Sequence, residues 1–351
     1  MSYTLAAAYP SLGRHLPKLD LATLPTPATM HLLHLDTGSF EVAVKHDEAT
    51  SNVYGGNKVR KLEFLLHRAR DRGAQRIATF GAVGSNHALA TAIHAADENL
   101  ECTCFLSHQK STPKIPFTLN MHRRIGTEIV PWGRGIEPLS LYREYLQGRN
   151  CWVIPLGGTC WLGSVGFINA GFELARQIAD GAVPKPARIY IAAGTTGSVA
   201  GLVTGLAAAR IDTEVHAIQV ADNPFASEEK LRKLIEKTVF ILNRYDPSFK
   251  AEGRQEQLVW RDEFLAGGYA RVDDVTSAAV TTARDQLGLS LETTYTGKAM
   301  AAVLHDLQSS RCNGDLFLYW HTANAASLPV TADRPDDLRN IPEEFARYYL
   351  D

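Results

Sequence analysis

Short apolar runs rich in Val, Ile and Thr alternate along the chain with longer stretches in which apolar residues recur at helical spacing. Such short runs predict buried strands, and their alternation with helices is typical of βα units on a mostly parallel sheet. We therefore expect an α/β fold. The expected strands cover residues 41–45, 76–80, 101–106, 188–193, 214–220 and 315–320.

Helices are expected between these strands. Residues 58–70 show the clearest helical period, with apolar side chains on one face and most charged side chains on the other. Residues 164–180 and 298–307 have similar spacing, and residues 88–97 form a further expected helix.

The length of the chain, 351 residues, exceeds what one hydrophobic core usually supports, so we expect two units. No Gly/Ser-rich linker separates them, and the boundaries are inferred from glycine-rich crossings. The expected larger unit comprises residues 1–58 and 164–351, and the smaller unit comprises residues 59–163.

Composition and charge narrow the class of protein. Hydrophobic residues make up 45% and charged residues 21%, close to the average for folded globular chains. The formal net charge is -2, and no Lys/Arg run is long enough to follow a phosphate backbone, so nucleic acid is not an expected partner. Residues 1–10 lack the pattern of a secretory signal.

The cysteines indicate a compartment. They are odd in number and lack C-x-x-C pairs, which favours reduced structural thiols in a cytoplasmic protein. The five are Cys102, Cys104, Cys151, Cys160 and Cys312.

One segment imitates a membrane helix. Residues 189–209 contain no charged side chain and are about long enough to cross a bilayer. The glycines, threonines and serine of residues 194–198 dilute its hydrophobicity. A buried strand, a glycine turn and a buried helix are the better interpretation, so a membrane is not an expected partner.

The first candidate for chemistry is Lys58, in the run Gly55-Gly56-Asn57-Lys58. The lysine follows two glycines and opens a helix, so its amine lies where the loop backbone can approach a ligand closely. The positive end of a helix lowers the pKa of an amine, which favours Schiff-base chemistry. The alternative is an ordinary solvated lysine, and this segment alone does not decide between them.

A second motif, Gly84-Ser85-Asn86-His87, lies between an expected strand and an expected helix. Backbone amides at such a helix start bind a carboxylate or phosphate, and the Ser85 hydroxyl and Asn86 amide add donors. The alternative is that Ser85 or Asn86 only caps the helix, with His87 on the surface of its first turn.

A third motif, Gly194-Thr195-Thr196-Gly197-Ser198, again joins a strand to a helix, and its glycine turn suits a monophosphate. It lacks the Lys-Ser/Thr ending of a P-loop and the spacing of the G-x-G-x-x-G dinucleotide fingerprint, so a nicotinamide-dependent dehydrogenase receives little support. A tight turn that binds nothing is the alternative.

Polar residues of the C-terminal part form a fourth group, which comprises Tyr269, Tyr295, Thr296 and Thr322. Each is also consistent with core packing or with capping of a helix. A catalytic tyrosine needs a partner that orients its hydroxyl, and the sequence does not show one.

Together the motifs resemble, in order, those of the D-cysteine desulfhydrase and 1-aminocyclopropane-1-carboxylate deaminase family, which are fold type II pyridoxal phosphate enzymes. The similarity covers about residues 24–327, and residues 55–63 are its most specific part. It implies two open, twisted, mostly parallel sheets flanked by helices, as in the tryptophan synthase beta subunit. It also implies pyridoxal 5'-phosphate as cofactor, a small amino acid as substrate and a homodimer.

The resemblance assigns cofactor roles residue by residue. It implies that Lys58 carries the cofactor as a Schiff base and that Asn86 binds its phenolic oxygen. Lys61 and the loop of residues 194–198 would hold the phosphate.

Other positions match the substrate side of that family. Ser85, Asn86 and His87 match residues that hold the substrate carboxylate, and Ser85 also matches a proton or nucleophile role. Tyr269 and Tyr295 match active-site tyrosines. With Lys58 as base, a leaving group on the β carbon would be expelled, and pyruvate and ammonia would be released.

Two residues distinguish the branches of the family. The deaminase branch carries Glu where this chain has Thr296 and Gln where it has His87, so both favour the desulfhydrase branch. Either Thr296 or Thr322 would face the pyridine nitrogen. Ring opening as in the deaminase, racemisation of an amino acid, and cofactor binding without turnover are the alternatives.

The chain departs from the family mainly on the substrate side. Ala323-Asn324-Ala325 stands where the family has Gly-Gly, and Ala270-Arg271-Val272 stands where a Gly-x-Pro segment is expected. We expect added volume near the ring and a charge from Arg271 at the rim of the pocket, so a different small amino acid is an alternative substrate.

Overall fold

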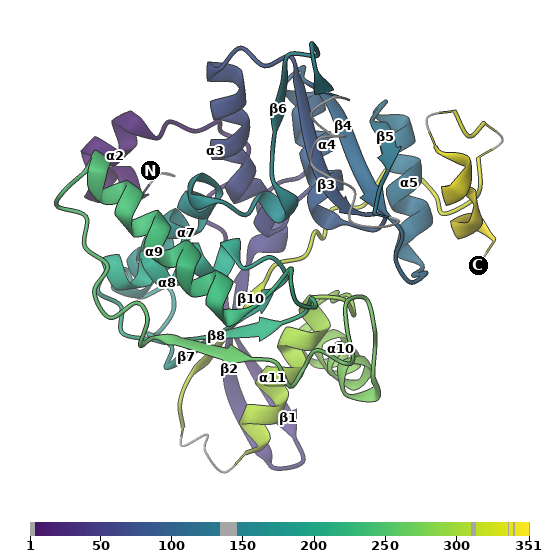
Figure 1. Cartoon of the computed structure of the whole chain (residues 1–351). Coiled ribbons are helices and arrows are strands. Elements are labelled where there is room, and N and C mark those ends of the chain that lie inside the picture. Colours follow the sequence, from purple (N-terminus) through teal and green to yellow (C-terminus); the bar gives the residue numbers. More distant parts are fainter. Residues whose placement is uncertain (1–3, 134–145, 310–313, 336, 340, 351) are drawn as a thin grey trace.

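The computed structural model describes residues 4–133, 146–309, 314–335, 337–339 and 341–350. Its described part contains two open sheets, a six-stranded one in the lower half of Figure 1 and a four-stranded one in the upper half. Helices cover both sheets, so the protein is α/β, as the sequence predicts.

The larger sheet is parallel except at one edge, where β1 runs antiparallel to β2. A two-residue turn joins these two strands. In spatial order its strands are β1 (Ala28–Leu35), β2 (Gly38–His46), β10 (Phe317–His321), β7 (Arg188–Ala193), β8 (Glu214–Gln219) and β9 (Leu258–Arg261).

Helices cover both faces of the larger sheet, because successive side chains of a strand point to opposite faces. Val42 and Val44 pack on one face in a core with α10 and α11, whereas Ala43 between them packs on the opposite face with α7, α8 and α9. These helices are α7 (Trp161–Ala179), α8 (Gly197–Ala208), α9 (Glu228–Tyr245), α10 (Asp274–Leu287) and α11 (Thr296–Gln308).

The smaller sheet is parallel throughout. Helices α3, α4 and α5 share the main core of this half, and Phe80 stacks on Phe105 in a separate small cluster. In spatial order the strands are β5 (Glu128–Pro131), β4 (Glu101–Ser107), β3 (Arg76–Ala82) and β6 (Cys151–Val153), and the helices are α3 (Asn57–Asp71), α4 (Asn86–Asp97) and α5 (Lys114–Arg124).

Short helices complete the described chain, and the C-terminal segment lies beside α5 at the right of Figure 1. Asn120 of α5 donates to the Thr331 carbonyl oxygen at 2.7 Å and accepts from the Tyr349 hydroxyl at 2.7 Å. The short helices are α1 (Thr4–Ala8), α2 (Pro10–His15), η1 (Asp47–Ala49), η2 (Leu156–Gly158) and η3 (Glu343–Tyr349).

All six expected strands and all four expected helices are present. The segment that imitates a membrane helix forms β7 and α8, and no described helix is long and apolar enough to cross a membrane. Cys312 lies outside the described residues, and the other four cysteines are free thiols. The division into residues 1–58 with 164–351 and residues 59–163 stays a prediction.

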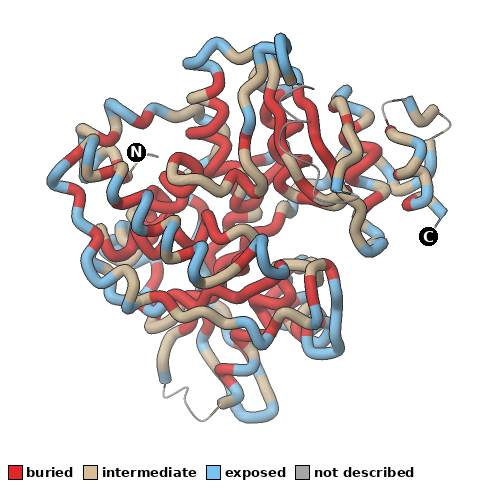
Figure 2. The backbone as a smooth tube through the Cα atoms, in the orientation of Figure 1, coloured by how far each residue is buried: buried red, intermediate tan, exposed pale blue. Residues whose placement is uncertain are grey.

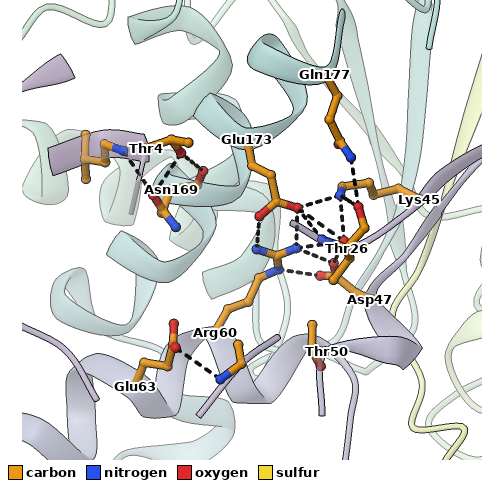
Figure 3. A network of polar contacts seen from close by, with 12 residues as sticks. Thr4, Thr26, Lys45, Asp47, Thr50, Arg60, Glu63, Asn169, Glu173 and Gln177 are labelled. Atoms are coloured by element: carbon orange, nitrogen blue, oxygen red, sulfur yellow. Dashed lines mark hydrogen bonds and ion pairs between the residues drawn. The ribbon is translucent and has the colours of Figure 1, made fainter. Parts of the chain in front are cut away.

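Helix α3 is buried along most of its length (Figure 2) and is held against β2 and α7 by an ionic cluster (Figure 3). Arg60 donates to Asp47 at 2.7 and 2.9 Å and to Glu173 at 3.0 Å from two nitrogens. Lys45 donates to the same Glu173 at 2.5 Å. Two cations and two carboxylates compensate one another, as buried charges require. The cluster fixes the helix that begins with Lys58.

Candidate active site

Two adjoining cavities lie at the carboxyl ends of strands from both sheets, where ligands bind in open α/β folds. The first, the inner cavity, has a volume of about 460 Å³ with its open mouth included. It is lined by Asn57, Lys58, Lys61, Asn86, Ala192, Gly194, Thr195, Thr196, Gly197, Ser198, Glu292, Tyr295, Thr296, Thr322 and Ala323.

The second, the outer cavity, is wider, at about 980 Å³, and more apolar. It shares Lys58, Gly194, Thr195 and Tyr295 with the inner cavity, so these residues stand where the two meet. Its other polar lining includes Ser85, His87, Ser107, His108, Gln109, Lys110, Asp222 and Tyr269.

Lys58 occupies the first turn of α3 and faces both cavities. The preceding Gly56 has φ of +94°, and a Cβ there would lie 2.8 Å from the Thr322 carbonyl oxygen, so only glycine fits. The Asn57 amide donates to that oxygen at 3.1 Å. Burial lowers the pKa of Lys58 to about 8. A lysine so placed is a cavity residue rather than a solvated one.

Lys61, one turn further along α3, lies beside the N-terminus of α8. Its Nζ donates to the Gly157 carbonyl oxygen at 3.1 Å, and a Cβ on Gly197 would lie 2.9 Å from that Nζ. Thr196 at the start of α8 has φ of +68° and provides no side-chain cap, so the first amides of α8 stay available. Burial, and then the charge of Lys58, lowers the pKa of Lys61 well below its ordinary value.

The inner cavity has little negative charge to balance the two lysines. Among its lining residues the single carboxylate is Glu292, and that carboxylate accepts hydrogen bonds from the backbone amides of residues 294, 295 and 296 at 2.7–2.9 Å. An uncapped helix N-terminus beside two buried amines favours an anion such as a phosphate monoester.

The residues of the motif Gly84-Ser85-Asn86-His87, at the start of α4, have different roles: one caps the helix and others line a cavity. The Ser85 hydroxyl accepts from the Ala88 amide at 3.2 Å, so the capping alternative is correct for Ser85, although this residue also lines the outer cavity. Asn86 lines the inner cavity, and its Oδ1 accepts from the hydroxyl of Tyr54 and from the amine of Lys114.

His87 is buried, so the alternative that places it on the surface is wrong. Its Nε2 lies 2.9 Å from the Thr79 hydroxyl. Burial, followed by the charges of Lys58 and Lys61, lowers the pKa of His87 well below its ordinary value. The imidazole is therefore neutral where it faces the outer cavity.

Tyr269 and Tyr295 meet through their hydroxyl oxygens, which lie 2.7 Å apart, with the rings edge to face. Burial raises the pKa of Tyr269 to about 12 and raises that of Tyr295 well above its ordinary value. The Tyr269 amide donates to Asp222 at 2.9 Å, which fixes the loop. Both phenols are neutral at ordinary pH, and one of the two hydroxyls donates to the other.

The two threonines expected near a ring nitrogen differ in their surroundings. The Thr296 hydroxyl donates to the Glu292 carbonyl oxygen at 3.1 Å and accepts from the Glu292 amide at 2.9 Å. The Thr322 hydroxyl has no hydrogen bond within the described part of the chain. Thr322 is therefore the freer of the two to bind a ligand.

Two segments depart from the family pattern, residues 323–325 and residues 270–272, and only part of them lines a cavity. Ala323 lines the inner cavity, but the Asn324 side chain accepts from the Gly55 amide at 2.7 Å and so supports the loop before Lys58. Arg271 is exposed and lines neither cavity, so the expected charge at the pocket rim is wrong. Ala270, which precedes it, is buried with φ of +55°.

All the candidate residues that the sequence predicts line one of the two cavities, and the structure adds three. Glu292 anchors the start of α11, and an acidic residue just before a helix is a recognisable signal. Asn57 donates to the Ser198 hydroxyl at 3.0 Å, and Gln109 lies over Gly84. Neither of these two contacts has a sequence signal, because each joins segments far apart in the chain.

Comparison with known proteins also indicates a pyridoxal phosphate enzyme. Residues 20–322 match the family model described as pyridoxal-phosphate dependent enzyme. The chain is 30% identical over 322 residues to a D-cysteine desulfhydrase of Salmonella choleraesuis (strain SC-B67), which covers 89% of this chain and 95% of that protein. A D-cysteine desulfhydrase of Klebsiella pneumoniae is 29% identical over the same shares.

Solved structures show the same architecture. A structure described as an ACC deaminase homologue superposes with a TM-score of 0.76 at 27% identity, covering 90% of this chain and 94% of that one. A threonine deaminase isoform of Solanum lycopersicum has a TM-score of 0.58 at 16% identity, covering 93% and 89%, and shares the fold.

Proposed function

The chain belongs to the family of pyridoxal-phosphate dependent enzymes, and on that premise we propose that it is a D-cysteine desulfhydrase-like lyase. It would convert a small amino acid with a leaving group on the β carbon into pyruvate and ammonia. The observation that carries the proposal is the position of Lys58, an amine with a pKa of about 8 at the junction of the two cavities.

We propose that the residues lining the inner cavity hold the cofactor. The amides at the start of α8 and the amine of Lys61 suit the phosphate, and a Cβ on Gly197 would lie 2.9 Å from that amine, so the amine and the helix start lie side by side. Lys58 would hold the aldehyde group, Asn86 the phenolic oxygen and Thr322 the ring nitrogen. We propose these roles because all four side chains line one cavity.

Bound pyridoxal phosphate withdraws electrons from the α carbon of an attached amino acid and so acidifies the α proton. The residues of this chain do the rest. Lys58 would accept the α proton, because its lowered pKa leaves a useful share of neutral amine near pH 8.

The substrate would bind in the outer cavity. We propose that the amides and side chains of Ser85, Asn86 and His87 hold its carboxylate at the start of α4, whose first turn they form or precede. The Tyr295 hydroxyl faces both cavities and can donate a proton to a departing thiolate. Tyr269 would then pass a proton to Tyr295 through the 2.7 Å contact and take up another from solvent.

The neutral His87 and the neutral tyrosines match a substrate with a small, uncharged side chain. D-cysteine is the proposed substrate, because the relatives named D-cysteine desulfhydrase match this chain over 95% of their length. The balanced reaction takes up one water and releases sulfide, ammonia and pyruvate.

The test is release of keto acid from a panel of D- and L-amino acids by the purified holoenzyme, with sulfide measured in parallel. We expect D-cysteine to give pyruvate and sulfide in equal amounts, and Lys58→Ala to give neither. A holoenzyme that releases no keto acid from any member of the panel, or that only exchanges the α proton in heavy water, contradicts a lyase.

A second candidate activity is the opening of a cyclopropane amino acid, which the superposition on an ACC deaminase homologue favours. The same panel should therefore contain 1-aminocyclopropane-1-carboxylate. Release of 2-oxobutyrate and ammonia without activity on D-cysteine would favour this candidate.

We also propose a cytoplasmic homodimer. The free thiols of the described residues support a reducing compartment, and the edge strand β1 exposes Met30 and Leu32, at 39% and 52%, as a surface for a second copy. Light scattering with size-exclusion chromatography tests the dimer, and a mass of one chain at micromolar concentration contradicts it.

A further inference from the structure

Three side chains with metal-binding atoms meet at the ends of two strands, outside both cavities. His46 ends β2, His321 ends β10, and the two are register partners on adjacent parallel strands. Glu48 in η1 approaches both of them. Its Oε1 lies 2.5 Å from the His46 Nδ1, and its Oε2 lies 2.9 Å from the His321 Nδ1.

We propose that His46, Glu48 and His321 form a zinc site. All three ligand atoms lie within 4.8 Å of one another. Atoms that share one zinc ion lie roughly 3 to 4 Å apart, since each is about 2.0–2.2 Å from the metal. Small side-chain movements therefore suffice to place one ion among them. Two imidazoles and a carboxylate are ligands that zinc prefers, whereas calcium and magnesium prefer oxygen alone.

An independent observation comes from hydrogen bonding. His321 is only 1% exposed, and its Nε2 has no hydrogen-bond partner among the described residues. Its Nδ1 meets only the Glu48 Oε2, 2.9 Å away and outside hydrogen-bond geometry. Buried polar atoms are normally paired, so an unpaired set calls for a water or an ion. A cation bound to the His321 Nδ1 and the Glu48 Oε2 would satisfy both atoms at once.

The surroundings of His46 fit the same role. Its Nδ1 faces Glu48, and its Nε2 lies 2.6 Å from the Thr29 hydroxyl. Metal-binding histidines usually donate their second ring N–H to an oxygen, which fixes the ring and the tautomer. The Thr29 hydroxyl also lies 2.7 Å from the His31 Nε2, so it can accept from one imidazole and donate to the other.

The site would stabilise the base of the cofactor loop. A Cβ on Gly55 would lie 2.1 Å from the Glu48 carbonyl oxygen, so the loop before Lys58 packs directly on the residue that holds the metal. Thr322 follows His321 and accepts from the Asn57 amide at 3.1 Å. A bound cation would join the ends of β2 and β10 with η1. This role does not depend on which amino acid the enzyme converts.

The experiment uses holoenzyme that has been dialysed against a chelator and then freed of chelator and excess cofactor. Zinc chloride is titrated in by calorimetry. We expect about one zinc per chain, and an affinity reduced at least tenfold in His46→Gln and Glu48→Gln. Both replaced side chains are partly exposed, so these variants should fold, which circular dichroism and the visible cofactor band verify.

The matched control is His34→Gln, because His34 is an exposed histidine of the same hairpin that contacts Ser39 instead. It should bind zinc like the unchanged protein. X-ray absorption at the zinc edge should show nitrogen and oxygen neighbours, including imidazole, and no sulfur. Absence of stoichiometric binding, an affinity unchanged in both His46→Gln and Glu48→Gln, or a sulfur neighbour would each overturn the proposal.

Discussion

The hydroxyl oxygens of Tyr269 and Tyr295 lie 2.7 Å apart, although the two residues come from different loops. Tyr295 precedes α11, and Tyr269 is held by Asp222 after β8. Their contact joins the wall of the inner cavity to the wall of the outer cavity. It gives each phenol the orienting partner that the sequence alone does not show.

This contact predicts the effect of removing one hydroxyl. Tyr295→Phe should lower kcat by about 10²-fold, in line with the usual contribution of a positioned acid, and should leave KM within a few-fold. Steady-state assays with D-cysteine measure both constants. Tyr245→Phe, far from both cavities on α9, is the control and should behave like the unchanged enzyme. Equal activity of Tyr295→Phe would exclude proton donation by this phenol.

The lowered pKa of Lys58 predicts a pH dependence for cofactor binding. Only the neutral amine reacts with an aldehyde, and with a pKa of about 8 roughly one amine in ten is neutral at pH 7. The neutral fraction of the amine rises with pH. Because folding lowers the pKa, this fraction passes one half near pH 8 and levels off at higher pH. The rate at which apoenzyme recovers its visible band should therefore have a midpoint near pH 8. A rate still rising steadily towards pH 10.5 would show that Lys58 is not desolvated.

Lys61 should contribute to cofactor affinity rather than to turnover. A hydrogen bond to a charged group is worth about 1.5–3 kcal/mol, so Lys61→Gln should weaken cofactor binding roughly 10- to 100-fold. Equilibrium dialysis against pyridoxal phosphate measures this dissociation constant. The matched control, Lys237→Gln, removes an exposed lysine of α9 and should change nothing. An unchanged affinity in Lys61→Gln would place the phosphate elsewhere.

The buried ionic cluster predicts a large loss of stability when one member is removed. Arg60→Met leaves Asp47 and part of Glu173 without their cation, which should cost about 3–5 kcal/mol of unfolding free energy. Urea denaturation of the apoenzyme, monitored by circular dichroism, measures the change. Arg176→Gln removes an exposed ion pair with Asp180 and should leave the midpoint nearly unchanged. Similar midpoints for both variants would contradict the assignment of a stabilising role to the cluster.

The C-terminal segment should influence substrate binding. The Tyr348 hydroxyl donates to the Gln109 carbonyl oxygen at 2.9 Å and accepts from the Gln109 amide at 3.1 Å, and Gln109 lines the outer cavity. Tyr348→Phe should raise KM about three- to tenfold, since a hydrogen bond contributes about 0.5–1.5 kcal/mol. Cofactor affinity should not change.

Tyr349→Phe is the matched control, because the Tyr349 hydroxyl contacts Asn120 in α5 instead of a cavity residue. Its KM should equal that of the unchanged enzyme. If both variants raise KM alike, the effect belongs to packing of the segment and not to the position of Gln109.

The buried strands were predictable because a strand that is buried on both faces appears in the sequence as a short run of apolar residues. Strand β7 has the bounds that its apolar run predicts, since it is covered on both faces. Strand β1 has no such run, because only Leu33 of its eight residues is buried. Strand β6, with three residues, is too short for any period. Both were missed for these reasons.

The residues of the candidate site were predictable where a short sequence motif is enough to determine the local backbone conformation. The glycines before Lys58 and in the loop before α8 mark places where a Cβ would collide with the backbone or with Lys61. Contacts such as Asn57 with Ser198, or Tyr348 with Gln109, join residues more than a hundred positions apart. Such pairs follow from the packing of two sheets, which periodicity does not reveal.

The central claim is that Lys58, where the two cavities meet, carries the cofactor. Reduction of the holoenzyme with borohydride makes the bond between lysine and cofactor permanent, and peptide mass mapping then locates it. The account predicts one phosphopyridoxyl group per chain, on Lys58 and on no other lysine. A group located on Lys61 or another lysine, or no modification in a holoenzyme that retains its visible band, would contradict it.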